Sequence, residues 1–203
     1  NDRVIGGITR HCADRTAELY RTITDGVCHV TTARTAELVK LMENAYRDVN
    51  IAFANEMSLV SDRLDINVWE AIDMANHHPR VNILKPGPGV GGHCIAVDPW
   101  FIVDGAPEDT ALIQAARGVN DSKPGHVVGQ ILDAAKHHDA PTIACLGLAY
   151  KANIDDLRES PAIEIVRLLA EAKVGDILVV EPNVKTLPEE LAGGERTSLV
   201  SLN

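Results

Sequence analysis

The chain has 203 residues, of which 45% are hydrophobic, so it can bury a substantial core, which disfavours disorder and small disulfide-stapled scaffolds. Nineteen basic and twenty-nine acidic residues give a net charge of -10, which argues against a nucleic-acid or membrane-surface partner. No run approaches the roughly 20 apolar residues of a membrane-spanning helix, and four widely spaced cysteines predict reduced thiols and a cytoplasmic location.

The first 34 residues are expected to be the last β-α-β piece of a larger sheet. Val4-Ile5 predicts a short strand, the segment 13–23 a helix, and the segment 27–32 a second strand. The chain starts with Asn instead of Met, and the segment 197–203 resembles a strand with nothing after it. Both ends are therefore expected to be cut.

Residues 35–138 are expected to be mostly helical. Apolar residues recur every three or four positions from Thr35 to about Ser61, which predicts one long amphipathic helix with Thr35 as its N-cap. Another helix is predicted over 67–75, and a helical region over 108–138 with breaks at Gly118 and at Pro124-Gly125. A loop rich in Pro and Gly, residues 78–94, connects these helices.

The last part of the chain, residues 139–203, has the pattern of a parallel sheet. The segment 142–148 is typical of a buried strand, Ser160-Pro161 begins a helix that extends to about Ala172, and the segment 176–180 is a second strand. Strand, helix and strand at this spacing predict a partial Rossmann-like unit, and the fold class predicted for the chain is α/β.

The run Gly87-Pro88-Gly89-Val90-Gly91-Gly92 superficially resembles the dinucleotide fingerprint G-x-G-x-x-G. We reject that interpretation because the fingerprint leaves a strand and begins a helix, whereas this run follows a helix and contains prolines. Its glycines would instead let the backbone approach a ligand closely, unless the run is only a connector.

Cys94 is the candidate nucleophile. A lone cysteine is more often a small buried hydrophobe, as Cys28 and Cys145 in their apolar runs are expected to be. Cys94, however, follows two glycines and His93, precedes Asp98 by four residues, and lies where a short helix through 99–103 would begin. A helix start favours the thiolate. His93 itself is expected to be structural or to face solvent.

Two further groups of polar residues are candidates. Lys40 and Asn44 are four residues apart and so project from one helix face, either as a solvated surface or as a buried pair that holds charge on a reacting oxygen. Tyr150-Lys151 and the segment 155–160 follow a buried strand at the carboxyl edge of the predicted parallel sheet, where ligands bind in open α/β sheets.

These motifs resemble the UDP-glucose/GDP-mannose dehydrogenase family. The resemblance covers essentially the whole chain. The following segments match, in order, the family's central helix, catalytic loop and C-terminal domain: Lys40-Leu41-Met42-Glu43-Asn44; Gly91-Gly92-His93-Cys94 with Asp98; and Gly147-Leu148-Ala149-Tyr150-Lys151 with Asp156-Leu157-Arg158-Glu159-Ser160. Within the family, the stretch 78–103 most resembles the branch that acts on UDP-N-acetyl-D-mannosamine.

The resemblance implies three parts. Residues 1–34 would end an N-terminal NAD-binding Rossmann domain, residues 35–138 would form a helical domain that makes a homodimer, and residues 139–203 would be a partial Rossmann-like UDP-binding domain. The NAD fingerprint and the family's catalytic Thr and Glu would lie upstream. The chain is therefore expected to be inactive alone.

The activity that the resemblance implies is a two-step oxidation of the C6 alcohol of a UDP-sugar to a carboxylate, with two NAD and no metal. The Cys94 thiolate would add to the aldehyde, the thiohemiacetal would lose a second hydride to give a thioester, and water would release the acid. Asp98 would position or activate water, and Lys40 and Asn44 would stabilise the oxyanion.

The resemblance also implies ligand contacts. The residues expected at the UDP-sugar are Arg80, Lys85, Gly89, Gly91, Tyr150 and Lys151. Arg80 would reach across the dimer, and Arg158 would touch NAD. Two alternatives stay open: an enzyme for UDP-N-acetylglucosamine or UDP-glucose, since one pocket side chain can exchange hexoses, and a dimeric UDP-binding module without catalysis.

Overall fold

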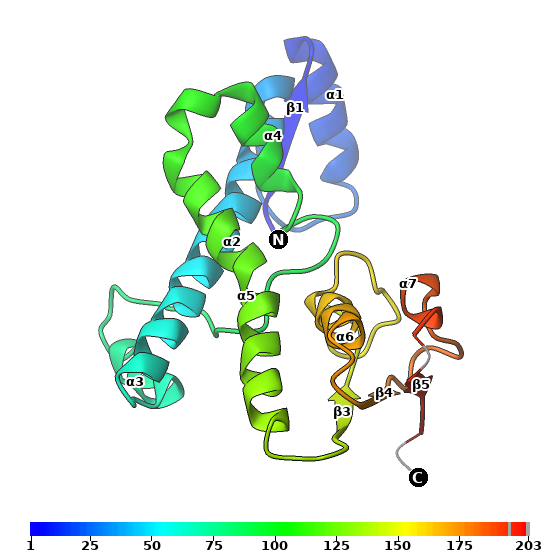
Figure 1. The fold of residues 1–203 in the computed structure, drawn as a ribbon. Coiled ribbons are helices and arrows are strands. Elements are labelled where there is room, and N and C mark those ends of the chain that lie inside the picture. Colours follow the sequence, from blue (N-terminus) through cyan, green and yellow to red (C-terminus); the bar gives the residue numbers. More distant parts are fainter. Residues whose placement is uncertain (195, 202–203) are drawn as a thin grey trace.

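The computed structural model describes residues 1–194 and 196–201 and has the α/β architecture that the sequence predicts. Two small parallel sheets lie at opposite ends of a pair of long helices, α2 and α5 (Figure 1). The elements are, in chain order, β1 (Arg3–Gly7), α1 (Arg10–Tyr20), β2 (Cys28–Thr32), α2 (Ala33–Arg63), α3 (Val68–Ala75), α4 (Asp98–Gly105), a 3-10 turn (Pro107–Asp109), α5 (Ala111–Ala135), β3 (Thr142–Leu146), α6 (Pro161–Glu171), β4 (Asp176–Val180), α7 (Glu189–Ala192) and β5 (Thr197–Leu199).

The first sheet is the predicted β-α-β unit. Strands β1 and β2 pair in parallel from Arg3 with Cys28 to Gly7 with Thr32, and α1 crosses between them. Helix α1 begins after Thr9, whose hydroxyl accepts a hydrogen bond from the backbone N–H of Cys12. The prediction of two strands and a helix here is confirmed, with the second strand starting one residue later than expected.

Helix α2 begins earlier than predicted. Its N-cap is Thr32, and the Thr32 hydroxyl accepts a hydrogen bond of 3.2 Å from the backbone N–H of Thr35. Thr35, the predicted cap, is therefore the capped residue. The sequence missed this because strand β2 leads into the helix without a connecting loop, so its last residue also caps the helix.

The apolar stripe of α2 is divided between two faces. The residues that the chain itself buries are small or polar: Asn44, Ala45, Asp48, Ala52, Ala54, Asn55 and Ser61. The large side chains of Leu38, Met42, Tyr46, Phe53 and Val60 are 41–70% exposed. The predicted periodicity marks a helix, as expected, but much of the large apolar surface faces away from this chain.

Helix α5 is continuous, so the predicted breaks at Gly118 and Pro124-Gly125 are wrong. Gly118 and Gly125 face open space, and the helix accommodates Pro124 in its interior. A proline there removes one backbone hydrogen bond. Side chains in the turn just before Pro124 fasten α5 to α2: Asn120 donates to Asp48, and the Lys123 ammonium donates to the Ser58 hydroxyl at 2.9 Å. Tertiary contacts thus override the local signal.

The second sheet has the parallel order β3-β4-β5. Strand β4 and helix α6, which is capped by Ser160, match the predicted segments closely, whereas β3 ends two residues early at Leu146. Residues 202–203 of the predicted last strand lie outside the described residues. The core is formed by side chains of the sheet, α5 and α6, among them Leu148, Val166, Leu169, Ile177 and Val179.

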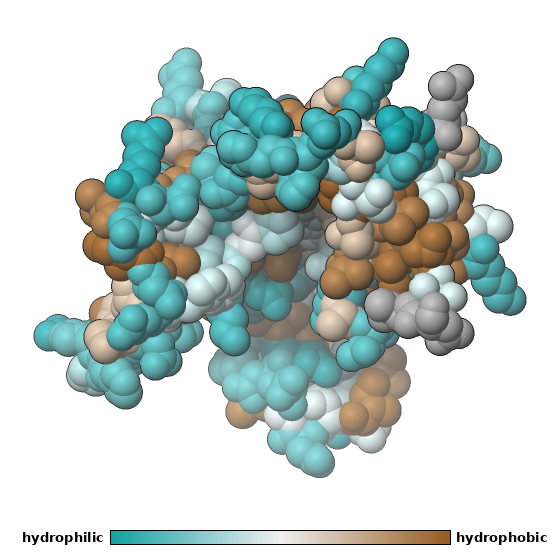
Figure 2. Space-filling view, turned by 60° about the horizontal axis from the view of Figure 1, so that its bottom comes forward, coloured by the Kyte–Doolittle hydropathy of each residue, from teal (hydrophilic) through white to brown (hydrophobic). Residues whose placement is uncertain are grey.

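The opposite face of this sheet is open. Leu146 on β3 is 73% exposed, and Figure 2 shows hydrophobic side chains gathered at the right of the view, where this part of the chain lies. Parallel sheets are usually covered on both faces.

Among the described residues, no helix is long and apolar enough to cross a lipid bilayer.

Candidate functional site

A chain of hydrogen bonds joins α2 to the loop that carries Cys94. The Lys40 ammonium donates to the side-chain oxygen of Asn44 at 3.3 Å, and the Asn44 amide donates to the Asp98 carboxylate at 2.6 Å. The backbone N–H of Asp98 donates to the carbonyl oxygen of Cys94 at 2.7 Å. Four residues predicted from two distant segments are therefore brought together.

Cys94 lies in a turn rather than at a helix start. Helix α4 begins at Asp98, four residues after the position predicted, and the Cys94 carbonyl closes the preceding turn by accepting from Val97 and Asp98. The Cys94 thiol is partly buried and not disulfide-bonded. His93, next to it, is exposed, which agrees with the solvent-facing position expected for it.

Lys40 and Asn44 differ in burial. Asn44 is buried, as a residue that holds charge on a reacting oxygen should be, but the Lys40 side chain is 62% exposed and lies 3.8 Å from the Glu43 carboxylate. Of the two alternatives left open by the sequence, Asn44 therefore matches the buried pair and Lys40 the solvated surface. Its ammonium is nevertheless fixed in direction by its hydrogen bond to Asn44.

Two glycines of the loop, Gly91 and Gly92, allow a neighbouring segment of the protein to approach closely. A Cβ atom on Gly91 would lie 2.5 Å from the carbonyl oxygen of Glu159 and 2.7 Å from Cβ of Tyr150. Gly92 has a φ of +86°, which favours glycine, and the Tyr150 ring lies against it. The Gly92 N–H donates to the carbonyl oxygen of Arg158 at 3.1 Å. The loop is therefore packed directly onto the segment before α6.

A buried carboxylate shapes the turn after β3. Glu181, at the end of β4, accepts hydrogen bonds from the backbone N–H groups of Leu148 at 2.8 Å and Ala149 at 3.1 Å. Burial raises the pKa of Glu181, but these bonds and those from Asn183 outweigh it, so the net pKa is lowered. The charged form of Glu181 thus holds the turn that leads to Tyr150. Sequence reasoning missed this residue, although a lone acid ending an apolar strand was a usable signal.

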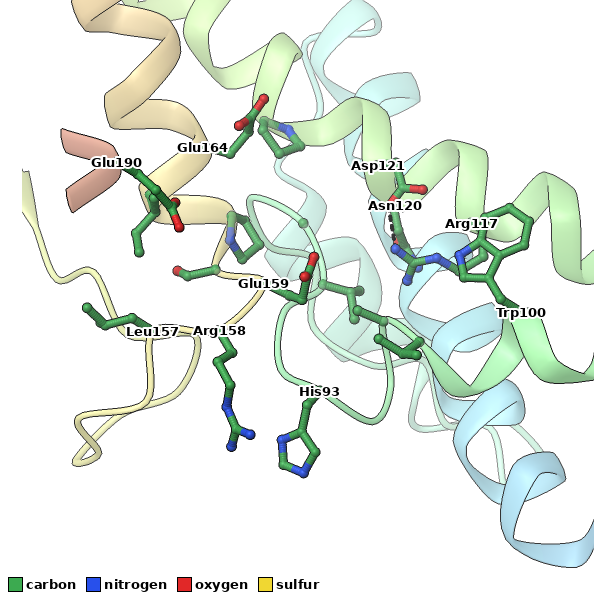
Figure 3. Close-up of a pocket in the computed structure, with 18 residues that line it drawn as sticks. His93, Trp100, Arg117, Asn120, Asp121, Leu157, Arg158, Glu159, Glu164 and Glu190 are labelled. Atoms are coloured by element: carbon green, nitrogen blue, oxygen red, sulfur yellow. Dashed lines mark hydrogen bonds and ion pairs between the residues drawn. The ribbon is translucent and has the colours of Figure 1, made fainter. Parts of the chain in front are cut away.

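Arg158 is held in place by its neighbour Asp156. The guanidinium makes two hydrogen bonds to the carboxylate, from Nε to Oδ1 at 2.9 Å and from Nη2 to Oδ2 at 2.7 Å. These bonds lower the pKa of Asp156 to about 2. The side chains of Arg158 and His93 extend to the same side of the loop (Figure 3). Arg158 is exposed and thus free to contact a ligand.

A cavity of about 740 Å³ lies between the loop, α5 and the start of α6 (Figure 3). Its lining carries more acid than base: Arg117, Arg158 and His93 against Asp121, Glu159, Glu164 and Glu190. An anionic nucleotide would be repelled by such a lining. Cys94 and Asp98 are not among the described residues that line it. The cavity and the Cys94 cluster are therefore neighbours on one loop, not one site.

The remaining predicted ligand contacts are dispersed. Arg80, Lys85 and Lys151 are exposed, and among the described residues none makes a side-chain hydrogen bond or ion pair to the Cys94 cluster. Gly89 has a φ of +144° and contacts Pro161. Of the residues predicted to hold a nucleotide sugar, Gly91 and Tyr150 lie against each other, since a Cβ atom on Gly91 would meet Cβ of Tyr150.

The candidate for a cofactor turn in the first sheet is the end of β1, where Gly6 and Gly7 precede the turn to α1. Binding a dinucleotide requires free space above such a turn, so that backbone N–H groups can hold the pyrophosphate. A Cβ atom on Gly6 would lie 2.6 Å from the Thr32 carbonyl, and one on Gly7 would lie 2.5 Å from the backbone nitrogen of Ala13. The chain's own backbone fills that space, so this turn does not fit NAD.

A buried polar cluster connects α2 and α5 next to the loop, and sequence reasoning missed it. Its side chains are those of Asp48, Asn55, Arg117 and Asn120, which are 0–3% exposed. Asp48 and Asn55 extend the face of α2 that carries Lys40 and Asn44. Polar residues at core positions of that helix were the signal that could have revealed the cluster.

The sequence and the fold of this chain are similar to those of known proteins. Residues 34–122 match the central domain of the UDP-glucose/GDP-mannose dehydrogenase family, and residues 144–202 match the UDP binding domain of that family. Among solved structures, the UDP-N-acetyl-mannosamine dehydrogenase of Staphylococcus aureus is similar, with a TM-score of 0.83 and 43% identity over 99% of this chain and 50% of that one.

Two curated relatives are named for different sugar substrates or products. The NDP-N-acetyl-D-galactosaminuronic acid dehydrogenase of Ralstonia solanacearum is 61% identical over 195 residues, which is 96% of this chain and 46% of that protein. The UDP-N-acetyl-D-mannosamine dehydrogenase of Campylobacter jejuni is 58% identical over 203 residues, which is 100% of this chain and 50% of that protein. The chain thus spans about half the length of the curated relatives it matches.

Proposed function

Because this chain belongs to the UDP-glucose/GDP-mannose dehydrogenase family, we propose that it is the cysteine-bearing part of a nucleotide-sugar 6-dehydrogenase. The proposed reaction oxidises the C6 alcohol of UDP-N-acetyl-D-mannosamine to the uronic acid. The observation that carries the proposal is the hydrogen-bonded chain from Lys40 through Asn44 to Asp98, which ends at the backbone of Cys94.

The UDP-sugar dehydrogenases of this family are NAD-dependent, and bound NAD accepts the hydride released in each oxidation. The residues of this chain act on the sugar. The Cys94 thiolate adds to the C6 aldehyde to form a thiohemiacetal, whose oxidation leaves a thioester. Attack by water on the thioester carbon then releases the carboxylic acid and restores the thiol. Asn44 and Lys40 stabilise the oxyanion that each addition creates, and Asp98 positions the water.

We assign the nucleotide sugar to the segments that surround the loop. In this proposal Arg80, Lys85, Gly89 and Gly91 hold the UDP-sugar from the loop side, and Tyr150 and Lys151 hold it from the second sheet. Arg158 contacts NAD. The exposure of Arg80, Lys85 and Lys151 supports this assignment, because an exposed cation can bind phosphate. Arg158 is also exposed, although its guanidinium is paired with Asp156.

The proposed function is tested with a protein of the relatives' length and the 203-residue chain assayed side by side. We expect the longer protein to form two NADH per acid from UDP-N-acetyl-D-mannosamine. We expect the chain alone to show no turnover and no NAD binding by calorimetry, because the space beside Gly6 and Gly7 in the first sheet is filled by the chain's own backbone. UDP-N-acetylgalactosamine is tested in parallel because of the Ralstonia relative. A longer protein that oxidises no nucleotide sugar, or a chain that binds NAD at micromolar concentration, would contradict the proposal.

We further propose that the chain forms a homodimer through α2. The support is the row of large apolar side chains on its exposed face, defined above, among them Leu38, Met42 and Tyr46 at four-residue spacing. Such a contiguous apolar patch usually marks a protein interface.

The dimer leads to a specific expectation. Tyr46→Glu places a charge in the middle of this patch and should convert the dimer to a monomer at micromolar concentration, measured by analytical ultracentrifugation. Arg47→Glu, at an exposed position one residue along the helix, is the matched control and should remain dimeric. A wild-type chain that sediments as a monomer would show that the exposed stripe has another purpose.

Two broader assignments complete the proposal. We propose that residues 1–34, 35–138 and 139–203 are separate domains, since the two sheets do not pair with each other and lie at opposite ends of the long pair α2 and α5. We also propose a cytoplasmic location, supported by four cysteines that carry free thiols.

A further inference from the structure

The loop that carries Cys94 is fastened to α2 at two points. At one end the Gly87 N–H donates to the side-chain oxygen of Asn55 at 2.8 Å, and at the other the Asp98 carboxylate accepts from the amide of Asn44 at 2.6 Å. Asn44 and Asn55 are eleven residues apart, close to three helical turns of about 3.6 residues each, so they lie on one face of α2. Cys94 lies between the two fastened points.

The direction of the Asn55 amide follows from a buried ion pair. The Arg117 guanidinium donates to the Asp48 carboxylate at 2.7 Å. A carboxylate only accepts, so Asn120 must turn its NH₂ group toward Asp48, which it does at 2.8 Å. Asn120 then presents its oxygen to Asn55, and the Asn55 NH₂ donates to it at 2.9 Å.

The consequence is that only the Asn55 oxygen is left to face the loop, where it accepts from Gly87. The ion pair thus fixes the orientation of the Asn120 amide, and Asn120 fixes that of Asn55. As a result, the Asn55 side-chain oxygen faces the backbone N–H of Gly87. All four side chains are buried, so competition from water is weak and each reversal would leave like groups facing each other.

We propose that Asn55 is a positioning residue for the Cys94 loop, with its orientation set by Asp48, Arg117 and Asn120. Asn55 touches neither Cys94 nor a ligand site; it fixes where the loop leaves α2. Its effect on catalysis rests on the proposed function, whereas its effect on the loop does not.

The first test measures the loop itself in the 203-residue chain. Asn55→Ala should speed hydrogen exchange of the Gly87 amide by about tenfold relative to the wild type, the size expected when one buried hydrogen bond is lost. It should also change the rate at which iodoacetamide alkylates Cys94, measured by mass spectrometry against the exposed Cys12 in the same molecule.

Two further variants make this test specific. Ser58→Ala is the matched control, because Ser58 also bridges α2 to α5, through Lys123, but makes no hydrogen bond to the loop among the described residues. It should leave both rates unchanged. Asn55→Asp keeps an oxygen that can face Gly87 but loses the NH₂ group that donates to Asn120, so it should recover only part of the protection of the Gly87 amide. If Asn55→Ala does not fold, Asn55→Leu, which fills the same space, replaces it.

The second test uses the longer protein. Asn55→Ala should lower kcat by about 10- to 100-fold with a smaller change in KM, because a misplaced nucleophile slows chemistry more than binding. Unchanged Gly87 exchange, or a loss of kcat no larger than that of Ser58→Ala, would overturn the proposal. If the longer protein has no activity at all, the proposed function fails, and the exchange and alkylation rates still decide the role of Asn55.

Discussion

Replacing Cys94 with Ala in the longer protein is expected to lower acid formation by roughly 10³-fold or more, because the methyl group of Ala cannot form the thioester. The fold should not change. Cys94 has a partly buried side chain in a turn whose hydrogen bonds are made by its backbone, and Ala preserves that backbone. NADH production and the acid product are measured together, so that oxidation to the aldehyde is distinguished from the second step.

Cys94→Ser distinguishes the chemical role of the thiol from the space that the side chain fills. The hydroxyl fills nearly the same space, but it is a weaker nucleophile and a poorer leaving group, so an ester that hydrolyses slowly should accumulate and be visible by mass spectrometry of the intact protein. Replacement of the exposed Cys12 by Ser, as a control, should leave the rate of acid formation unchanged. Acid formation by Cys94→Ala at the parent rate would end the covalent mechanism.

Elements with a strong local signal were predicted well. Strand β4 is an unbroken apolar run, and α6 has a Ser-Pro start, and both were located from the sequence. The prediction failed where tertiary contacts override local preference. Pro124 is a strong helix breaker in isolation, yet α5 continues through it because neighbouring side chains bind α2. The cap of α2 was misplaced for a related reason, since strand and helix share Thr32.

The sequence predicted the residues of the Cys94 cluster but not the residues that hold the loop and the neighbouring turn in position. The helical spacing of Lys40 and Asn44, and the motif around Cys94, identified residues that the fold does bring together. The sequence did not show that the loop glycines pack against Tyr150, because glycine signals close approach without saying to what. It also did not show Asn55 or Glu181, because a buried polar residue is recognised only when its partner is known.

Arg117→Met is expected to have the largest effect on stability, lowering the free energy of unfolding by about 3–5 kcal/mol. The variant would leave the Asp48 carboxylate buried without its cation, in a pair whose side chains are 3% and 0% exposed. The pair is already imperfectly satisfied, because Asp48 Oδ2 and Arg117 Nε lack a hydrogen-bond partner among the described residues. Removing both charges, as in Arg117→Met with Asp48→Leu, should therefore cost less than the single change.

The effect should depend on pH. Burial raises the pKa of Asp48 and outweighs Arg117 and Asn120, which lower it, so the net pKa is raised. A carboxyl group with a higher pKa in the folded state than in the unfolded state binds its proton more tightly when folded, and its contribution to stability falls as pH rises between the two pKa values. Without Arg117 the folded-state pKa of Asp48 should rise further and widen that window.

Urea unfolding of the parent and of Arg117→Met, at about pH 5 and about pH 7.5, tests this linkage. The difference in unfolding free energy should be smaller at the lower pH and larger at the higher pH, because protonation of Asp48, which its raised pKa favours, removes the charge that the variant leaves without a cation. Arg167→Met is the matched control: its pair with Glu164 is 38% and 43% exposed, so its loss should cost less than about 1 kcal/mol. Equal losses for the two arginines at the higher pH would mean that the Asp48 pair is not buried in solution, and the fixed orientation of Asn55 would lose its basis.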